Sequence, residues 1–463
     1  MRLRKLALLF LILAFGGVVE TAYTLKTRMG IGPTGCRVLT GRFQGPSYSF
    51  ETEEIREAVP ADLALHVDNA FGEVRVWKGE PGRVRLRLRK VVFLPTEERA
   101  RELAASLKPS LILEGNTLRV TTNRRELEDS NDVGLETHLS LEVPPETKVN
   151  VTNEHGAAHV SDAKQATVWS SYDAVRVERI AGPAEVNNRH GDVSAESIGG
   201  LLKLHSRHGN VEVKDVAQAV TLTLEHGDAR VSRVEALKAS VLYSDLVVET
   251  VRGELEVQGR HASVHASDVK GRALVDTTYR NVTLQKLGAD ARVKTEHGAV
   301  TAEDLAGALS VEVTYDDVLA SNVAGPIEAR VSHGGFRGRG FKQGARVKNS
   351  GDDVELDEFE GPIDVETQRG SVRLQPEHAI QDAVSVTASR GGIHLDVPAG
   401  SRFELDASTR RGELQVNVPD LTITQSSSSQ LKARLGQGGK NVMLRSEHGD
   451  ISVESRTASA ATK

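Results

Sequence analysis

Histidine and tyrosine recur at one position along much of the chain, at intervals of 17 or 18 residues. Side chains that repeat in stacked strands become neighbours about 4.8 Å apart, so a column of histidines is a candidate metal site. Tyrosine fills the same position interchangeably, which suits planar rings that stack but not a ligand set of defined geometry. We therefore interpret the column as a structural ladder and assign no metal, cofactor or catalytic residue to it. Its members are His155, Tyr172, His190, His208, His226, Tyr243, His261, Tyr279, His297, Tyr315 and His333.

Paired carboxylates are the second group with potential chemistry, and they occur at Asp316-Asp317 and Asp352-Asp353. Two carboxyl groups that converge on one cleft perform acid and base catalysis in glycoside hydrolases. Here Asp or Asn recurs at nearly every corner of the repeat, where its ordinary role is to bond the backbone of a turn. We therefore expect no enzyme. A β-helix enzyme that acts on polysaccharide, as a lyase or a glycoside hydrolase, remains the alternative.

Short strands must carry the column. After His208 the apolar residues stand at offsets of 3, 5, 8, 12 and 14, and the same offsets follow Tyr279. A spacing of two within each pair predicts two strands per unit, each of which buries alternate residues. His-Gly-Asp at the column, and a glycine about ten residues later, supply the turns between the strands.

This self-similarity at about 18 residues predicts an all-β fold, a parallel β-helix or β-solenoid, over residues 149–456. A left-handed hexapeptide helix is excluded, because it needs an apolar residue at every sixth position. From Tyr243 to His333 the column alternates between Tyr and His, so one coil can take 18 or 36 residues. From residue 350 the spacing lengthens, and we interpret the last unit, around His448, as part of a C-terminal cap.

The first 28 residues carry a compartment signal. A basic start at Arg2, Arg4 and Lys5 precedes an apolar run from Leu6 to Val19, which predicts a signal peptide or an uncleaved signal-anchor over residues 1–28. In either case we expect the bulk of the chain outside the cytoplasm. The apolar segment can also attach the chain to a membrane.

The region between this signal and the repeat has its own organisation. Residues 29–60 contain Gly and Pro without a sustained period, which predicts a linker. Residues 61–148 predict a β-rich N-terminal capping segment with one helix near residues 96–107, where Thr96 is a candidate N-cap. At the other end of the chain, residues 457–463 are expected to be a disordered tail.

Charge composition bears on the class of partner. The formal net charge is -6, and acidic and basic residues alternate along the whole length. Nucleic-acid binding depends on a concentrated basic surface, so we expect no nucleic-acid partner.

The sequence resembles the bacterial putative-adhesin family of β-strand-repeat proteins, a domain of unknown function. The resemblance rests on the motif from Asn69 to Val74, on His-Gly-Asp-Val units such as His190 to Val193, and on the ending from Val397 to Ile451. It covers about residues 61–456 and implies architecture, with adhesion only by analogy. We therefore expect a non-catalytic exported β-solenoid, an adhesin or a cell-envelope scaffold, in the periplasm, anchored to the membrane or at the cell surface. Its partner, a protein or a glycan of the envelope or surface, is not indicated by the sequence.

Overall fold

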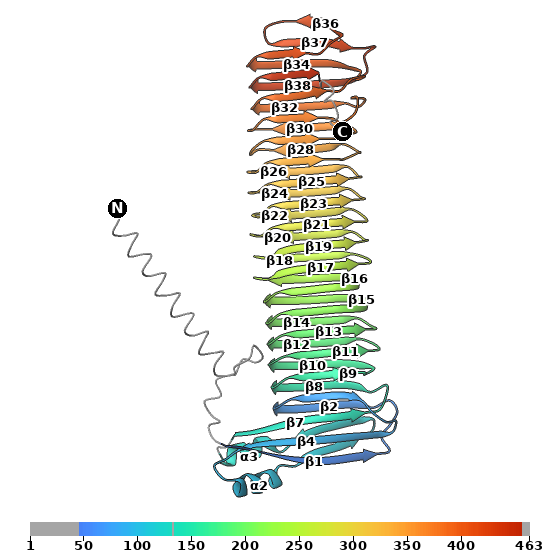
Figure 1. The fold of residues 1–463 in the computed structure, drawn as a ribbon, viewed down its shortest axis with the longest axis vertical. Helices are drawn as coiled ribbons and strands as arrows, with labels where there is room; N and C mark the ends of the chain where they lie inside the picture. The colour runs from blue at the N-terminus through green and yellow to red at the C-terminus, as the bar shows by residue number, and fades with distance from the viewer. Residues whose placement is uncertain (1–45, 132–133, 456–463) are drawn as a thin grey trace, which may run out of the picture.

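The computed structural model describes residues 46–131 and 134–455, which form a long β-solenoid with a smaller β-rich segment at its N-terminal end (Figure 1). The predicted fold class is confirmed, and the solenoid has about 14 turns. Strands pair in parallel with the equivalent strands of neighbouring units, as Ala166 pairs with Ala184 and Ala184 with Leu202. One coil therefore takes about 18 residues, which excludes the 36-residue alternative.

Each coil contributes one strand to each of two layers, and the apolar core lies between the layers. The long strands β15 (Val211–His226) and β16 (Ala229–Leu242) run through both layers. The first layer also contains β2 (Ala64–Phe71), β5 (Pro109–Glu114), β6 (Thr117–Thr122), β8 (Lys148–His155), β10 (Gln165–Tyr172), β12 (Ala184–His190), β14 (Leu202–His208), β18 (Leu255–Arg260), β20 (Ala273–Thr277), β22 (Ala291–Thr295), β24 (Leu309–Val313), β26 (Ile327–Val331), β28 (Ala345–Asn349), β30 (Ile363–Thr367), β32 (Val384–Arg390), β34 (Phe403–Arg411), β36 (Leu421–Ser426), β37 (Gln430–Leu435) and β38 (Lys440–His448).

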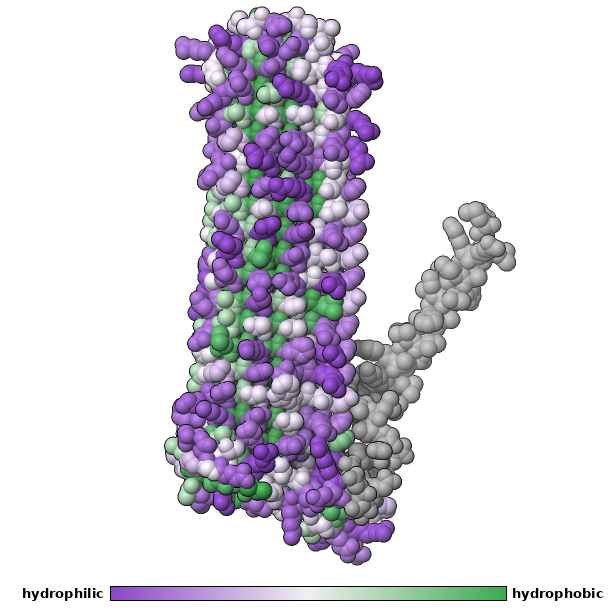
Figure 2. All heavy atoms as spheres, turned by 180° about the vertical axis from the view of Figure 1, so that it is seen from behind, coloured by the Kyte–Doolittle hydropathy of each residue, from purple (hydrophilic) through white to green (hydrophobic). Residues whose placement is uncertain are grey.

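The second layer contains the remaining strands. They are β1 (Ser47–Glu57), β3 (Val74–Lys78), β4 (Arg83–Phe93), β7 (Gly134–Val143), β9 (Ala158–Ser161), β11 (Val175–Ile180), β13 (Val193–Ile198), β17 (Asp245–Val251), β19 (Ser263–Val269), β21 (Val282–Leu287), β23 (Val300–Leu305), β25 (Val318–Val323), β27 (Phe336–Arg339), β29 (Val354–Asp357), β31 (Val372–Gln375), β33 (Ile393–Val397), β35 (Leu414–Asn417) and β39 (Ile451–Ser455). The surface seen in Figure 2 has a lengthwise strip of hydrophobic residues flanked by hydrophilic ones.

Near the end of most second-layer strands, one residue has a positive φ, in the left-handed region. This residue explains why the third apolar position of each unit follows the second by three residues and not by two. In β11, Val175 and Val177 are buried and alternate normally, whereas Arg179 has φ +52° and lets Ile180 point inward as well. Such a residue costs about 1 to 2 kcal/mol when it is not glycine. The equivalent residues with positive φ are Asp162, Ser197, Asp215, Arg233, Thr250, Asp268, Lys286, Asp304, Asn322, Gly340 and Glu358.

In some coils, the spacing of the coils requires glycine at the corner after the first layer, whereas Asp173, Ser244 and Ala262 stand at this corner in others. Gly209 has φ +133°, and a Cβ atom added there would lie 2.2 Å from the carbonyl oxygen of Gly191 in the neighbouring coil. Because the coils stack this closely, the His-Gly corner excludes any side chain at the glycine.

The N-terminal end differs in part from the prediction. The helix expected near residues 96–107 is α2 (Glu97–Ser106), and a second helix, α3 (Arg124–Asn131), was not predicted. The interpretation of residues 29–60 as a linker is wrong for Ser47–Glu57, which form β1 and pair antiparallel with β4. In β1, half-buried and exposed residues alternate only at the start of the strand. The rest of the strand is mostly charged and exposed, so its sequence has no strand pattern.

Lysine 90 fixes α2 to the sheet beneath it. Its buried Nζ donates hydrogen bonds to the carbonyl oxygens of Ala104 and Leu107, at 2.8 and 2.6 Å. These carbonyls belong to the last turn of the helix, where a cation complements the helix dipole. Burial lowers the pKa of Lys90, and the charge of Glu54 acts in the opposite direction.

Both ends of the solenoid are interleaved. Strands β38 and β39 lie between β32 and β33 on one side and β34 and β35 on the other. Strands β2 and β3 likewise lie between β6 and β7 on one side and β8 and β9 on the other. The unit that ends at His448 is therefore an inner coil of the C-terminal end region, although it comes last in the chain. The coil of β2 and β3 likewise belongs to the solenoid although it precedes residue 149.

Within residues 46–131 and 134–455, no helix has the length and apolar character needed to cross a membrane. The predicted signal segment at residues 1–28 and the predicted tail at 457–463 lie outside the described residues.

Candidate functional site: the aromatic column

The eleven predicted rings lie in one stack at the ends of the first-layer strands. Neighbouring ring centroids are 4.3 to 5.3 Å apart and the ring planes diverge by only 2° to 17°. The strand register causes this arrangement, since His190 pairs with His208 and His208 with His226. Parallel pairing at the strand spacing thus brings equivalent rings into van der Waals contact.

A twelfth ring, Phe71, begins the stack. Its centroid lies 4.1 Å from that of His155 at an angle of 23°, and the guanidinium carbon of Arg124 lies 4.5 Å from the Phe71 centroid on the ring face. Sequence periodicity missed Phe71 because the chain leaves the solenoid after β3 and returns only at β8. We call the twelve rings from Phe71 to His333 the aromatic column.

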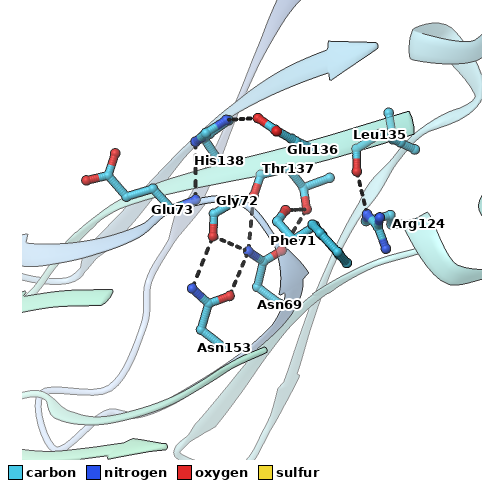
Figure 3. Close-up of polar contacts among 10 residues, drawn as sticks. All are labelled: Asn69, Phe71, Gly72, Glu73, Arg124, Leu135, Glu136, Thr137, His138 and Asn153. Carbon is cyan, nitrogen blue, oxygen red and sulfur yellow. Dashed lines mark hydrogen bonds and ion pairs between the residues drawn. The ribbon is translucent and has the colours of Figure 1, made fainter. Parts of the chain in front are cut away.

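The base of the aromatic column is held by a buried hydrogen-bond network (Figure 3). Asn69 donates from Nδ2 to the carbonyl oxygens of Gly72 and Thr137, at 3.0 and 3.1 Å. The hydroxyl of Thr137 donates to Asn69 Oδ1 and to the carbonyl oxygen of Phe71, and Asn153 also donates to Gly72. These bonds tie the first ring to β7, so the N-terminal segment fixes where the column starts.

The column presents ring edges to solvent. Tyr243, Tyr279 and Tyr315 are 52%, 52% and 51% exposed although a neighbouring ring covers each of their faces. A ligand ring therefore cannot stack on them without breaking the column. The exposed surface instead offers tyrosine hydroxyl and imidazole nitrogen atoms, repeated once per coil.

Histidines 190, 208 and 226 are the longest run of adjacent imidazoles in the column, with centroids 4.9 and 5.0 Å apart. Burial lowers the pKa of His190 most, and the charge of neighbouring His208 lowers it further. The neutral form of the His190 ring is therefore favoured. Across the part of the chain that the structure describes, no group of three or more His, Cys, Asp or Glu side chains is placed to hold a metal ion.

The corner carboxylates bond neighbouring coils. Asp192 Oδ1 accepts the backbone N–H of Asn210 at 2.8 Å, and Asn210 Oδ1 accepts that of Asp228 at 3.0 Å. One aspartate from each of the two carboxylate pairs noted in the sequence makes the same kind of bond. Asp317 Oδ1 accepts from Gly335 and Asp353 Oδ1 from Ser371, both at 2.7 Å. These bonds between neighbouring coils hold the coil register.

One acidic side chain is largely buried outside the column. Glu178 lies within 3.2 Å of His159 Nε2 and within 2.8 Å of both Arg176 and Arg179. Burial alone would raise the pKa of Glu178, but hydrogen bonds from the two arginines hold it below its ordinary value. A carboxylate that stays ionised among cations is a structural anchor and a poor general acid.

The fold and the aromatic column define an elongated, strand-repeat β-solenoid. The chain belongs to the Toastrack DUF4097 family, whose model matches residues 100–454. That family is a domain of unknown function, in agreement with the resemblance seen in the sequence. No curated protein matches the chain.

A crystal structure from Clostridium sporogenes, described as a "putative cell adhesion protein", is similar to this chain. The similarity covers 88% of this chain and 100% of that one, at 7% sequence identity and a TM-score of 0.16. At that TM-score, neither fold nor function is transferred from it.

Proposed function

We propose that the chain is a non-catalytic, exported β-solenoid that serves as an adhesin or as a scaffold of the cell envelope. The observation that supports this most directly is the unbroken aromatic column from Phe71 to His333, whose rings are half-buried or exposed along one corner. Solenoids bind partners along extended surfaces of this kind, because each coil presents the same groups as the next.

The surface charges support a scaffold more than a catalyst. On the first layer, ion pairs join neighbouring coils, as between Arg207 and Glu225 at 2.8 Å and between Lys238 and Glu256 at 2.9 Å. Exposed pairs contribute little stability each, about 0 to 1 kcal/mol, but their repetition from coil to coil supports a structural role for this surface.

Export is supported by the basic start at Arg2, Arg4 and Lys5 and the apolar run from Leu6 to Val19. The proposed partner is a protein or glycan of the cell envelope or of a neighbouring surface, and the apolar segment supplies attachment to the membrane.

Cell fractionation with protease treatment of intact cells tests the location. We expect the native protein in the envelope fraction, and its recovery as a soluble cytosolic protein would refute export. Incubation of the purified chain with polysaccharides tests the alternative, since new reducing ends or unsaturated uronides would indicate a hydrolase or a lyase.

A Tyr-to-His series separates structure from binding. The triple variant Tyr243→His/Tyr279→His/Tyr315→His keeps a planar ring at every coil but removes the hydroxyl groups of the three most exposed of the four tyrosines in the column. If the column is a contact surface, this variant should fold as the native chain does and attach less well in a cell-adhesion assay. Equal attachment of the variant and the native chain would exclude the edges of these three tyrosines as the contact.

A further inference from the structure

A groove of about 720 Å³ runs along the corner where second-layer strands end and first-layer strands begin. Its floor is made by the first inward residues of five successive first-layer strands, β22 to β30. They are Ala291, Leu309, Ile327, Ala345 and Ile363. An elongated apolar trough of this size is typical of a small-molecule site.

Small residues at one corner position hollow out the groove. In earlier coils the residue before the first inward residue varies in size, from Ala219 and Ala236 to Leu201 and Glu254. Five successive coils have only short side chains or proline there, namely Ala308, Pro326, Gly344, Pro362 and Ala383. Without a long side chain in these coils, the floor stays open over four coil steps, or about 19 Å. This length is comparable to one leaflet of acyl chains, about 15 Å deep.

The backbone groups at the floor of the groove already have hydrogen-bond partners. The carbonyl oxygens of Ala308, Pro326 and Gly344 accept the N–H groups of Ala291, Leu309 and Ile327, at 2.8 to 3.1 Å. Strands β22 to β30 are each paired on both sides. A bound peptide would bury unpaired polar groups at a cost, whereas an acyl chain has none.

Positive charge lies at the N-terminal end of the groove. Arg272 and Arg292 line it there, and among the described residues neither guanidinium has an ion pair or a hydrogen bond to a side chain. The third arginine of the lining, Arg346, is neutralised by Asp364 at 3.1 Å. Asp290 lines the same end, and its Oδ1 accepts the backbone N–H of Ala308 at 2.9 Å. Two arginines against one aspartate leave a net positive charge at this end, which complements an anionic group.

We propose that this groove binds one long-chain anionic amphiphile. Its acyl chain would lie along the corner from Ala308 to Ala383, and its carboxylate or phosphate would sit between Arg272 and Arg292. This site is distinct from the aromatic column, which lies at the opposite corner of each coil, and it does not depend on the proposed adhesive role.

Titration of the purified full-length chain with cis-parinaric acid, a fluorescent fatty acid, tests the proposal. We expect saturable binding of one molecule per chain, and Ala308→Trp should weaken it at least tenfold by filling the trough. Ala236 occupies the equivalent corner position in a coil outside the groove, so Ala236→Trp is the matched control and should bind as the native chain does. Ala383→Trp, at an exposed position, replaces Ala308→Trp if circular dichroism shows that the latter is misfolded.

A charge-reversal series tests the head-group end. Arg272→Glu/Arg292→Glu should weaken binding of the acid about tenfold and leave binding of its methyl ester unchanged, whereas the control Arg230→Glu/Arg260→Glu should change neither. Competition by lysophosphatidylglycerol would indicate a phospholipid, and competition by oleate alone a free fatty acid. Absence of saturable binding, or equal binding by the Ala308→Trp and Ala236→Trp variants, would overturn the proposal.

Discussion

Replacement of His226 by alanine removes one ring from the middle of the aromatic column. The His226 ring stacks on His208 at 5.0 Å and 6° and on Tyr243 at 5.3 Å and 2°. Alanine breaks both contacts, whereas tyrosine at the same position keeps a planar ring between the two neighbours. The pair of substitutions therefore isolates the contribution of stacking from that of the imidazole itself.

The expected magnitude follows from the two contacts. An aromatic pair contributes about 0.5 to 1.5 kcal/mol beyond area burial, so two lost pairs remove about 1 to 3 kcal/mol. Because the side chain is exposed at the surface, the lower end applies, and we expect a loss of about 1 kcal/mol for His226→Ala. His226→Tyr should be nearly silent.

Amide hydrogen exchange in β14, β15 and β16 measures this loss locally, because a change of about 1 kcal/mol is small against the whole solenoid. The alanine variant should exchange about fivefold faster in these strands. Gln218→Ala, at an exposed position of β15 outside the column, is the control and should leave the rates unchanged. Equal rates in the alanine and tyrosine variants would refute stacking, and stoichiometric zinc or nickel lost in a His190→Ala/His226→Ala variant would favour metal binding.

Three further outcomes are expected. Val213→Asp places an unpaired charge in the core, where Val213 is fully buried, and should lower the free energy of unfolding by several kcal/mol. Urea denaturation measures this loss, and an unchanged midpoint would contradict the assigned core. Gly209→Ala should destabilise the chain far more than Gly82→Ala, because both glycines have positive φ but only a Cβ at Gly209 meets a neighbouring coil, and thermal unfolding compares them. Glu178 has a lowered pKa in the folded state, so its stabilising contribution is complete above about pH 4.3 and is lost as the pH falls through the pKa of the folded state. Glu178→Gln should therefore reduce the loss of stability at acid pH, which unfolding measured as a function of pH tests.

The solenoid was predictable because its physics is local and repeated. One coil fixes the next, so the period of 18, the buried pairs such as Val211 and Val213, and the ring position can all be read from spacing alone. The residues with positive φ near the ends of the second-layer strands were not predictable. Arg179, Ser197 and Asp215 share a backbone conformation but no residue type, and tertiary packing imposes the conformation on each of them.

The interleaved ends were hidden for a different reason. Phe71 meets His155 although the two residues are 84 positions apart, and β38 enters between strands that precede it in the chain. Such pairings depend on a long excursion of the chain and leave no period in the sequence. The candidate lipid groove was missed as well, because its signal is the absence of long side chains at one corner position.

The ends of the solenoid explain how a stack of parallel strands stays finite. An open parallel edge would template pairing with another chain. Here the outermost strands β1, β5 and β36 each pair antiparallel with the strand inside them, and β35, which pairs in parallel with β39, has only four residues. Exposed glutamates cover β1, and β36 is mostly Thr, Gln and Ser. Charge at β1, shortness at β35 and polarity at β36 therefore protect these three edges, so the proposed partners would bind on the side surfaces, which carry the aromatic column and the groove.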